Sequence, residues 1–517
     1  MTFEIVFVLL SLLGMMAALI ADKMRPGMVL FSVVVLFLCV GILTPKEMLE
    51  GFSNKGMITV ALLFLVSEGI RQSGTLGQVI KKLLPQGKTT VFKAQLRILP
   101  SVAFISAFLN NTPVVVIFPP IIKHWAKSVK LPATKFLIPL SYVTILGGIC
   151  TLIGTSTNLV VHGMILEAGY EGFTMFELGK VGIFIAIAGI IYLFIFSKRL
   201  LPDARPDTAV PDEEVEEGEK LHRVEAVLGA RFPGINKKLS DFNFQRHYGA
   251  EVKEIKTRNG QRYVDHLEDV VLREGDTLVV MADDTFIPTW GESSVFVLLT
   301  NGNDPDTSGK KKRWLALILL VLMIVGATVG ELPATKEMFP DIKLDMFFFV
   351  CITTIIMAWT NIFPARKYTK YISWDILITI ACAFAISKAM VNSGVADCVA
   401  GFIIGLSDDY GPHVLLAILF VITNLFTELI TNNAAAALAF PLALSISAQL
   451  GVSPTPFFVV ICMAASASFS TPIGYQTNLI VQGIGNYKFT DFVRIGLPLN
   501  IITFLISVIL IPLIWNF

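Results

Sequence analysis

The sequence is poor in charge, since only 16% of its 517 residues are Asp, Glu, Lys or Arg, against about 25% in an average soluble domain. The net charge of +1 provides no excess of basic residues for a nucleic-acid backbone, and the basic residues are spread along the chain. Nucleic-acid binding is therefore not expected. Hydrophobic residues make up 54% of the chain and the mean hydropathy is +0.69, which indicates a protein embedded in a lipid bilayer.

The sequence also lacks the patterns of disulfide, metal and enzyme sites. Its six cysteines occur singly in apolar segments, with neither metal-ligand spacing nor a disulfide pattern. No nucleophile triad or phosphate-binding glycine loop stands out, because Gly260 and Gly275 are isolated turn glycines. We therefore do not expect an enzyme.

What the sequence does contain is a polar pattern that occurs twice inside long apolar stretches. The first copy is Asn110-Asn111-Thr112 and the second is Asn432-Asn433-Ala434. Matching loops follow at 151–158 and 471–478, displaced by 320 positions (477 − 157). Two membrane halves with interrupted apolar segments at corresponding places are typical of secondary transporters, whose site lies between the halves.

The apolar runs predict an all-α polytopic membrane protein with about 10 full spans, taking about 20 residues as the length of a spanning helix. The predicted spans are 3–20, 28–43, 57–70, 136–167, 181–196, 315–330, 346–363, 376–391, 457–484 and 495–515. Two further runs, 98–122 and 414–447, are broken by Asn and Pro near their centres. We predict that both are re-entrant hairpins.

Lys and Arg are concentrated in loops on one predicted side, which the positive-inside rule assigns to the cytoplasm. These loops include 81–97, 123–135, 198–199 and 366–370, whereas the opposite loops carry acidic residues such as Glu167, Glu171 and Asp397. Both termini are then external in the cell membrane. The first hairpin enters from the cytoplasm and the second from outside, so the repeat is inverted.

Between a first membrane half, 1–200, and a second, 313–517, the composition changes. Residues 202–219 are acidic and contain proline, and short strand patterns follow at 224–228, 252–256, 277–281 and 295–299. A helix is predicted over 236–242. Residues 201–312 therefore form a linker and a small α+β insert, and the basic run 310–313 places the insert in the cytoplasm.

The two polar tips and their loops resemble those of the divalent anion/sodium symporters of the ion transporter superfamily, whose hairpin tips carry a Ser-Asn-Thr signature twice. The insert resembles a TrkA-C (RCK-C) domain, through Arg231-Phe232-Pro233-Gly234-Ile235 and the turn and strand at 273–280. This combination is similar to the sulfate-transporting branch. The resemblance implies a cation-coupled carrier of a dianion, most simply sulfate, that forms a homodimer.

The resemblance also implies which residues form the site. The anion pocket would be lined by Asn110, Asn111, Thr112, Thr157, Asn432, Asn433, Ala434 and Thr477. One Na⁺ site would use Ser106, Asn110, Asn111, Thr151, Gly154 and Asn158, and the other Glu428, Asn432, Asn433, Thr471, Gly474 and Asn478. Oxygen atoms suit this hard cation. No Arg or Lys lies near either tip in the sequence, so amide and backbone groups would bind the anion.

Two positions depart from the family pattern. Glu428 stands four residues before Asn432, as Ser106 stands four before Asn110, where the family has a neutral hydroxyl. An ionisable group inside a membrane segment is a functional candidate, and Glu428 would either neutralise Na⁺ or carry H⁺. The alternative is a structural pair with Lys388. The second departure is Ala434 in place of threonine.

Several alternatives stay open. A carrier of the same fold would serve di- or tricarboxylates, arsenite or another oxyanion. An ion channel regulated by the insert is a rival class, although the sequence lacks a carbonyl-filter motif such as Thr-Val-Gly-Tyr-Gly. The ligand of the insert is unknown, with a nucleotide, an ion or a dimer contact all open. Glu68 and Arg71 are expected to form a salt pair, and His162 to have a hydrogen-bonding role.

Overall fold

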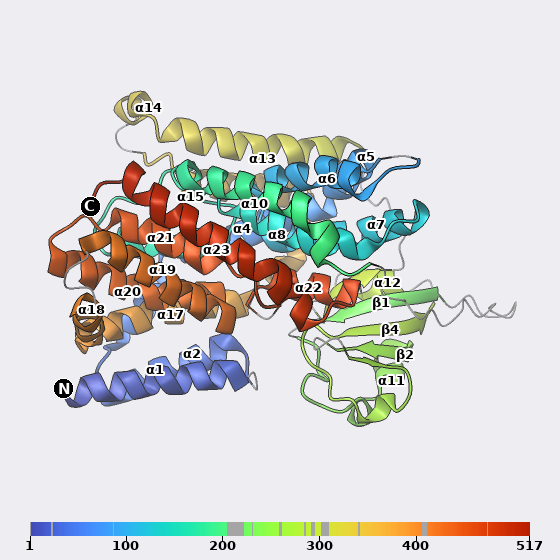
Figure 1. Cartoon of the computed structure of the whole chain (residues 1–517), viewed down its shortest axis with the longest axis horizontal. Helices are drawn as coiled ribbons and strands as arrows, with labels where there is room; N and C mark the ends of the chain where they lie inside the picture. Colours follow the sequence, from blue (N-terminus) through green and yellow to red (C-terminus); the bar gives the residue numbers. More distant parts are fainter. Residues whose placement is uncertain are drawn as a thin grey trace, which may run out of the picture.

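Figure 1 shows the computed structural model of the chain, a body of roughly parallel helices with a small β-sheet at one end. The structure describes all residues except 1, 22–23, 86, 204–221, 230, 258–260, 284–285, 291–294, 301–309, 340–341, 406–410 and 473. Most of the acidic stretch 202–219 and the turn glycine Gly260 therefore lie outside the described residues.

The helices fall into two groups on either side of the sheet in the sequence. The first group is α1 (Phe3–Ala21), α2 (Pro26–Val40), α3 (Pro45–Glu50), α4 (Lys55–Gln72), α5 (Thr75–Leu83), α6 (Val91–Ser106), α7 (Asn111–Ser128), α8 (Leu137–Gly148), α9 (Ser156–Glu167) and α10 (Gly179–Leu200). The second group is α13 (Lys310–Gly330), α14 (Pro333–Met338), α15 (Met346–Trp359), α16 (Tyr368–Tyr371), α17 (Trp374–Asn392), α18 (Val395–Gly405), α19 (Gly411–Leu429), α20 (Asn432–Leu450), α21 (Thr455–Ser466), α22 (Gln476–Gly485) and α23 (Phe489–Ile514).

Eight of the described helical segments are long and apolar enough to cross a membrane. They are 3–21, 45–72, 179–200, 311–330, 374–392, 411–429, 432–450 and 489–514. Large apolar side chains such as Ile183, Ile187 and Leu505 stay exposed along α10 and α23. Because soluble monomers rarely expose such continuous apolar surfaces, these faces are suited to lipid, and the chain is a multi-pass membrane protein.

Two of the spans predicted from sequence are each divided in two. The run 136–167 forms α8 and α9, and the run 457–484 forms α21 and α22, with non-helical residues between the helices of each pair. Both breaks fall at the repeated loops. Glycine explains the tight packing at the first, since a Cβ added to Gly154 would lie 2.5 Å from the carbonyl oxygen of Gly148.

The two polar tips each join a pair of helices. The first tip separates α6 from α7, and Pro113 lies in the first turn of α7, where its missing N–H costs no intrahelical hydrogen bond. The second tip separates α19 from α20, with Thr431 at the N-cap of α20. Helices that begin at the tips carry free N–H groups there, which suits these ends to bind an anion.

The insert is a five-stranded antiparallel sheet with strand order β3-β2-β4-β1-β5. The strands are β1 (His222–Leu228), β2 (Glu251–Lys256), β3 (Arg262–Tyr263), β4 (Thr277–Ala282) and β5 (Phe296–Thr300), accompanied by α11 (Phe244–Tyr248) and α12 (Phe286–Trp290). Four strands match the predicted ones to within two residues. The helix predicted over 236–242 is wrong, because that stretch holds only the 3-10 turn Leu239–Asp241 and α11 begins later.

The insert has its own aromatic core, in which Phe232 lies within 5.0 to 6.1 Å, between ring centroids, of Phe242, Phe244, Tyr248 and Phe296. It lies at the end of the helical body near α7 and α22 (Figure 1). Both chain termini lie at the opposite end (Figure 1). Residues from the two helical groups and the sheet therefore approach one another near α7 and α22.

Candidate functional site

The first tip is held by a short chain of hydrogen bonds. Ser106, the last residue of α6, donates its hydroxyl to Asn111 Oδ1 at 2.8 Å. Asn111 is buried. The Thr151 hydroxyl donates to the carbonyl of Ala107, and Thr151 Oγ1 accepts from the N–H of Gly154 at 3.2 Å. The tip and the loop after α8 are thus joined through buried oxygen atoms.

The second tip repeats these contacts one residue out of the register that the sequence predicted. Thr427 donates to Asn432 Oδ1 at 2.8 Å, as Ser106 does to Asn111. The Thr471 hydroxyl donates to the carbonyl of Glu428 at 3.1 Å, as Thr151 does to that of Ala107. Thr427 therefore occupies the position of Ser106, and the matching of Glu428 with Ser106 was wrong.

The shifted register also changes the second motif. Asn432 corresponds to Asn111, so Asn433 corresponds to Thr112. The motif of the second tip is therefore Thr431-Asn432-Asn433, equivalent to Asn110-Asn111-Thr112. Ala434 is buried at 1% exposure inside α20 and is not the counterpart of Thr112. Sequence comparison aligned the two Asn pairs because they are identical, whereas the hydrogen bonds align the residues by position.

Glu428 is surrounded by hydrogen-bond donors. Its carboxylate accepts from the N–H groups of Ser470 and Thr471 at 2.9 and 2.8 Å and from Asn500 Nδ2 at 2.8 Å. An ionised carboxylate only accepts hydrogen bonds, and these three groups are all donors. The proposed pair with Lys388 is wrong, because Lys388 is exposed and the carboxylate binds these donors instead.

Each tip also contacts the loop of the other half. Asn433 Oδ1 accepts from the hydroxyls of Ser156 and Thr157, both at 3.3 Å. At the first tip, the Thr112 hydroxyl lies 3.5 Å from Oε1 of Gln476 in the second loop. Segments about 280 to 360 residues apart in the chain therefore form one continuous site.

Tyr475 lies where these contacts meet. Its hydroxyl accepts from Asn111 Nδ2 at 2.6 Å and lies 3.1 Å from the hydroxyl of Thr155, which is the equivalent residue of the first loop. One side chain of the second loop thus contacts both the tip and the loop of the first half.

A cavity of about 970 Å³ opens at this junction. Five of the predicted anion-binding residues line it, namely Asn110, Thr112, Thr157, Asn432 and Asn433. The other three, Asn111, Ala434 and Thr477, are buried. Although no Arg or Lys lies near either tip in the sequence, Arg25, Arg231 and Lys370 also line this cavity.

Oxygen atoms suited to a cation gather behind each tip. Asn158 donates its amide to the carbonyl of Thr151 at 2.9 Å, but its Oδ1 is buried with no hydrogen-bond partner among the described residues. Asn478, its counterpart, donates to the carbonyls of Ser468 and Thr471 at 2.8 and 3.2 Å. An unpartnered buried acceptor beside the first tip fits the oxygen ligands that Na⁺ prefers.

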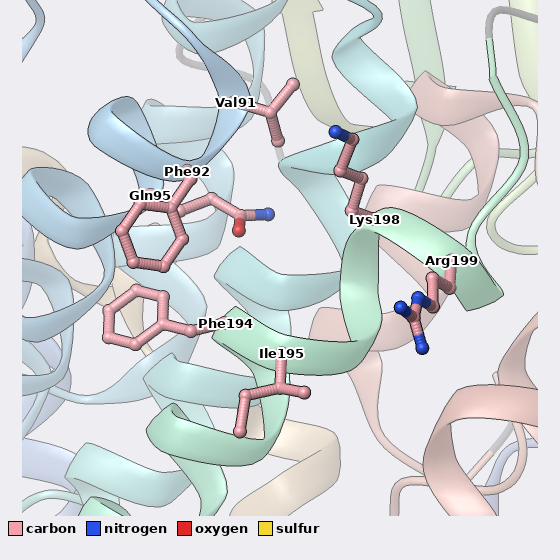
Figure 2. Close-up of a pocket in the computed structure, with 7 residues that line it drawn as sticks. All are labelled: Val91, Phe92, Gln95, Phe194, Ile195, Lys198 and Arg199. Carbon is pink, nitrogen blue, oxygen red and sulfur yellow. The ribbon is translucent and has the colours of Figure 1, made fainter.

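A second pocket, of about 430 Å³, lies between α6 and α10 (Figure 2). Phe92, Phe194 and Ile195 line it together with Lys198 and Arg199 near the end of α10. None of the predicted site residues is in this lining. Its exposed Phe92 and Ile195 place it on the apolar outer surface.

The remaining candidates have structural surroundings. Glu68 and Arg71 form the predicted salt pair, with 2.7 Å between Oε1 and Nη2. His162 lies within α9, and its Nδ1 has no hydrogen-bond partner in the described part of the chain, so the predicted hydrogen-bonding role gains no support there.

Sequence reasoning missed Thr427, Tyr475, Gln476 and Asn500. The loop repeat contained a signal for two of them, because Tyr475 and Gln476 stand 320 positions after Thr155 and Ser156. Asn500 lies in α23, outside both repeated motifs, and only the fold brings it to Glu428.

Comparison with known proteins identifies relatives along almost the whole chain. An uncharacterized transporter of Synechocystis sp. is 29% identical, over 94% of this chain and 93% of its own length. A probable sodium/sulfate cotransporter of Chlamydomonas reinhardtii is 32% identical over 54% of this chain and 31% of its own length. A sodium-dependent dicarboxylate transporter of Staphylococcus saprophyticus is 25% identical over 28% of each chain.

The sequence also matches the family CitMHS, described as Citrate transporter, over residues 16–446 and 338–517. These two matches overlap and together cover nearly the whole chain, including both tips and both loops. The converging polar tips, the cavity between them and this match agree, and the chain belongs to the CitMHS citrate transporter family.

Proposed function

We propose that this protein is a secondary active symporter that couples Na⁺ to the transport of a divalent anion, with sulfate as the substrate. One observation carries the proposal: both asparagine tips and both loops converge on a single cavity. Such convergence of matching segments from two halves is the arrangement of secondary transporters with inverted repeats.

The anion would be held by neutral groups at the junction of α7 and α20. Asn110, Thr112 and Asn433 line the cavity at the beginnings of these helices, where free N–H groups and the helix dipoles favour negative charge. The cations would bind behind the tips, one near Ser106, Asn111, Thr151 and Asn158 and the other near Thr427, Asn432, Thr471 and Asn478. Glu428 would offset the charge of the second cation through its ionised carboxylate.

Transport would proceed by alternating access. Na⁺ binding would order the tips, the dianion would then enter, and the unit of hairpins would move as a body, like an elevator, against the remaining helices. Because Tyr475 of the second loop bonds to Asn111, ordering of the first tip would also order the second loop. The surrounding helices would form a homodimer in the cell membrane, with both termini outside.

The insert would lie in the cytoplasm and belong to the TrkA-C class. Basic residues at the end of α7, including Lys123 and Lys127, support this side through the positive-inside rule. The opposite end, where both termini lie in Figure 1, would then be external.

Substrate choice is the part of the proposal with a specific rival. The family description names citrate, and one relative is named for dicarboxylates, whereas another is named for sulfate. A cavity of about 970 Å³ is large enough for a carboxylate. We favour sulfate because the relative with 32% identity includes that anion in its name and the cavity walls at the tips offer neutral donors.

The test is uptake of labelled sulfate, succinate and citrate into proteoliposomes under an imposed Na⁺ gradient or an imposed pH gradient. Sulfate uptake driven by Na⁺ is the expected result. Uptake of succinate or citrate without sulfate would replace the substrate and keep the carrier. Uptake that does not saturate with concentration, under any gradient, would indicate a channel and overturn the proposal.

A further inference from the structure

The cavity between the tips is not closed by helices alone. Gly229, Arg231 and Glu274 of the insert line it together with Asn110, Thr112 and Asn433 of the tips. The insert therefore forms part of the wall of the same space that contains the candidate anion site.

The charges around this cavity are balanced. The basic side chains that line it are Arg25, Arg231 and Lys370, and the acidic ones are Asp375, Glu274 and Glu428. An anion must enter a region whose positive and negative groups are equal in number, so loss of a single basic side chain leaves an acidic excess. Clefts lined by charge of one sign concentrate or repel ions strongly.

The insert is packed closely against α22, the helix that begins at the second loop. A Cβ added to Gly483 would lie 2.5 Å from Thr277 Oγ1, and one added to Gly275 would lie 2.5 Å from Leu479 Cγ. Gly275 has φ of +85°, so a side chain there would also strain the turn. The two glycines allow β4 and its preceding turn to approach α22.

An ion cluster attaches the insert to α7 as well. Glu225 of β1 lies 3.0 Å from Lys123 of α7 and 3.4 Å from Lys256 of β2. Burial raises the pKa of Glu225, but the two lysines outweigh burial and lower it to about 2. Val227, two residues further along β1, belongs to the apolar core of the helical body. The insert thus contacts both α7, which begins at the first tip, and α22, which begins at the second loop.

We propose that the insert supplies Arg231 to the substrate pathway, where its guanidinium attracts the transported anion at the mouth that faces the insert. The contacts with α7 and α22 hold Arg231 in the cavity wall. This inference rests on the proposed anion transport, but it adds a specificity-determining residue outside the helical halves.

The test uses membrane vesicles of both orientations, because the proposal predicts an effect on one face only. In vesicles whose insert faces the bath, Arg231→Glu should raise the KM for labelled sulfate roughly tenfold, with a small change in maximal rate. Arg231→Lys should restore most of the affinity. At an ionic strength of about 1 M the screening length is about 3 Å, so the difference in KM between Arg231→Glu and wild type should shrink there. In vesicles of the opposite orientation, the KM should be unchanged.

Arg246→Glu is the matched control, because Arg246 is exposed in the insert and does not line the cavity. It makes the same charge reversal in the same domain and should leave the KM unchanged on both faces. An unchanged KM for Arg231→Glu, or an equal change on both faces, would overturn the inference while wild-type uptake still supports anion transport. A wild type that transports none of the tested anions would overturn the proposed function, and this inference with it.

Discussion

The two tips follow one plan of hydrogen bonds but differ in charge. In both, a hydroxyl at the end of the first helix donates to a buried asparagine, at 2.8 Å in each case. In both, a threonine of the neighbouring loop donates to the next carbonyl, that of Ala107 or Glu428. The side chain beside that carbonyl is a methyl group at the first tip and a carboxylate at the second.

This difference shows how a repeated scaffold acquires two unequal sites. Thr151 and Thr471 bond to the backbone carbonyls of Ala107 and Glu428. These contacts do not involve the side chains of Ala107 and Glu428, so either side chain is tolerated there. The carboxylate of Glu428 is accommodated because Asn500, from α23, donates to it at 2.8 Å. We expect the second site to have the stronger preference for a cation.

The largest effect should come from the residues that the tips share. Asn111→Ala removes a buried amide with two side-chain hydrogen bonds, and Asn432→Ala removes one that accepts from Thr427, at a cost of about 1–3 kcal/mol for each unsatisfied partner. We expect roughly a hundredfold loss of anion uptake from either variant, measured in proteoliposomes at equal protein content.

Asn392→Ala is the control for this loss, because Asn392 bonds to Ile42 and Glu47 away from the cavity. All three variants should elute as folded protein in size-exclusion chromatography. Normal uptake by both tip variants would remove the tips from the site.

The charge difference is tested by Glu428→Gln, which keeps the shape of the side chain and makes the second tip neutral like the first. We expect the Na⁺ concentration for half-maximal uptake to rise roughly tenfold, since a nearby negative charge is lost. Uptake is measured against Na⁺ at fixed anion concentration and at several pH values. A changed pH dependence with an unchanged Na⁺ dependence would instead assign a proton to Glu428.

The link between the second loop and the first tip is tested by Tyr475→Phe, which removes the hydroxyl that bonds to Asn111 and Thr155. A lost hydrogen bond of about 1 kcal/mol corresponds to a roughly fivefold loss of uptake. In the double variant Tyr475→Phe/Thr155→Val, the fold loss of uptake should be smaller than the product of the two single losses, because both variants break the same contact. Independent, multiplicative losses would argue against a shared link.

The smallest effect on the site should come from Glu225→Gln, which leaves both tips intact and weakens the attachment of the insert. The pKa of Glu225 is lowered from 4.5 to about 2, so its contribution to stability is complete above about pH 4.5 and is lost as the pH falls towards 2. The variant should melt at a lower temperature than wild type at pH 7, and the difference should narrow on acidification. An equal difference at pH 7 and pH 3 would exclude the ion pair as its cause.

Much of the architecture could be predicted from residue patterns alone. The apolar runs located most helices, and strands at 224–228, 252–256, 277–281 and 295–299 were predicted almost as they occur. The breaks at 151–158 and 471–478 were expected as loops but not as ends of separate helices. Apolar length does not distinguish one long helix from two short ones, because both bury the same kind of side chain.

Five of the eight residues predicted for the anion site line the cavity, but the sequence matched the two tips one residue out of register. Asn432 and Asn433 looked like the partners of Asn110 and Asn111 because the letters match, yet Thr427 and Asn432 make the contacts of Ser106 and Asn111. Sequence identity compares residue types, whereas the equivalent positions of the two tips are those that make the same hydrogen bonds.

The sequence by itself determined that the chain is a membrane protein with two polar interruptions, because burial of apolar residues and the cost of unpaired backbone in lipid act within each segment. Only the tertiary structure decided which residues meet. Tyr475 of the second loop reaches Asn111 at the first tip, Asn500 reaches Glu428, and Arg231 of the insert lines the cavity. These contacts depend on the packing of segments far apart in the chain, and no local pattern encodes them.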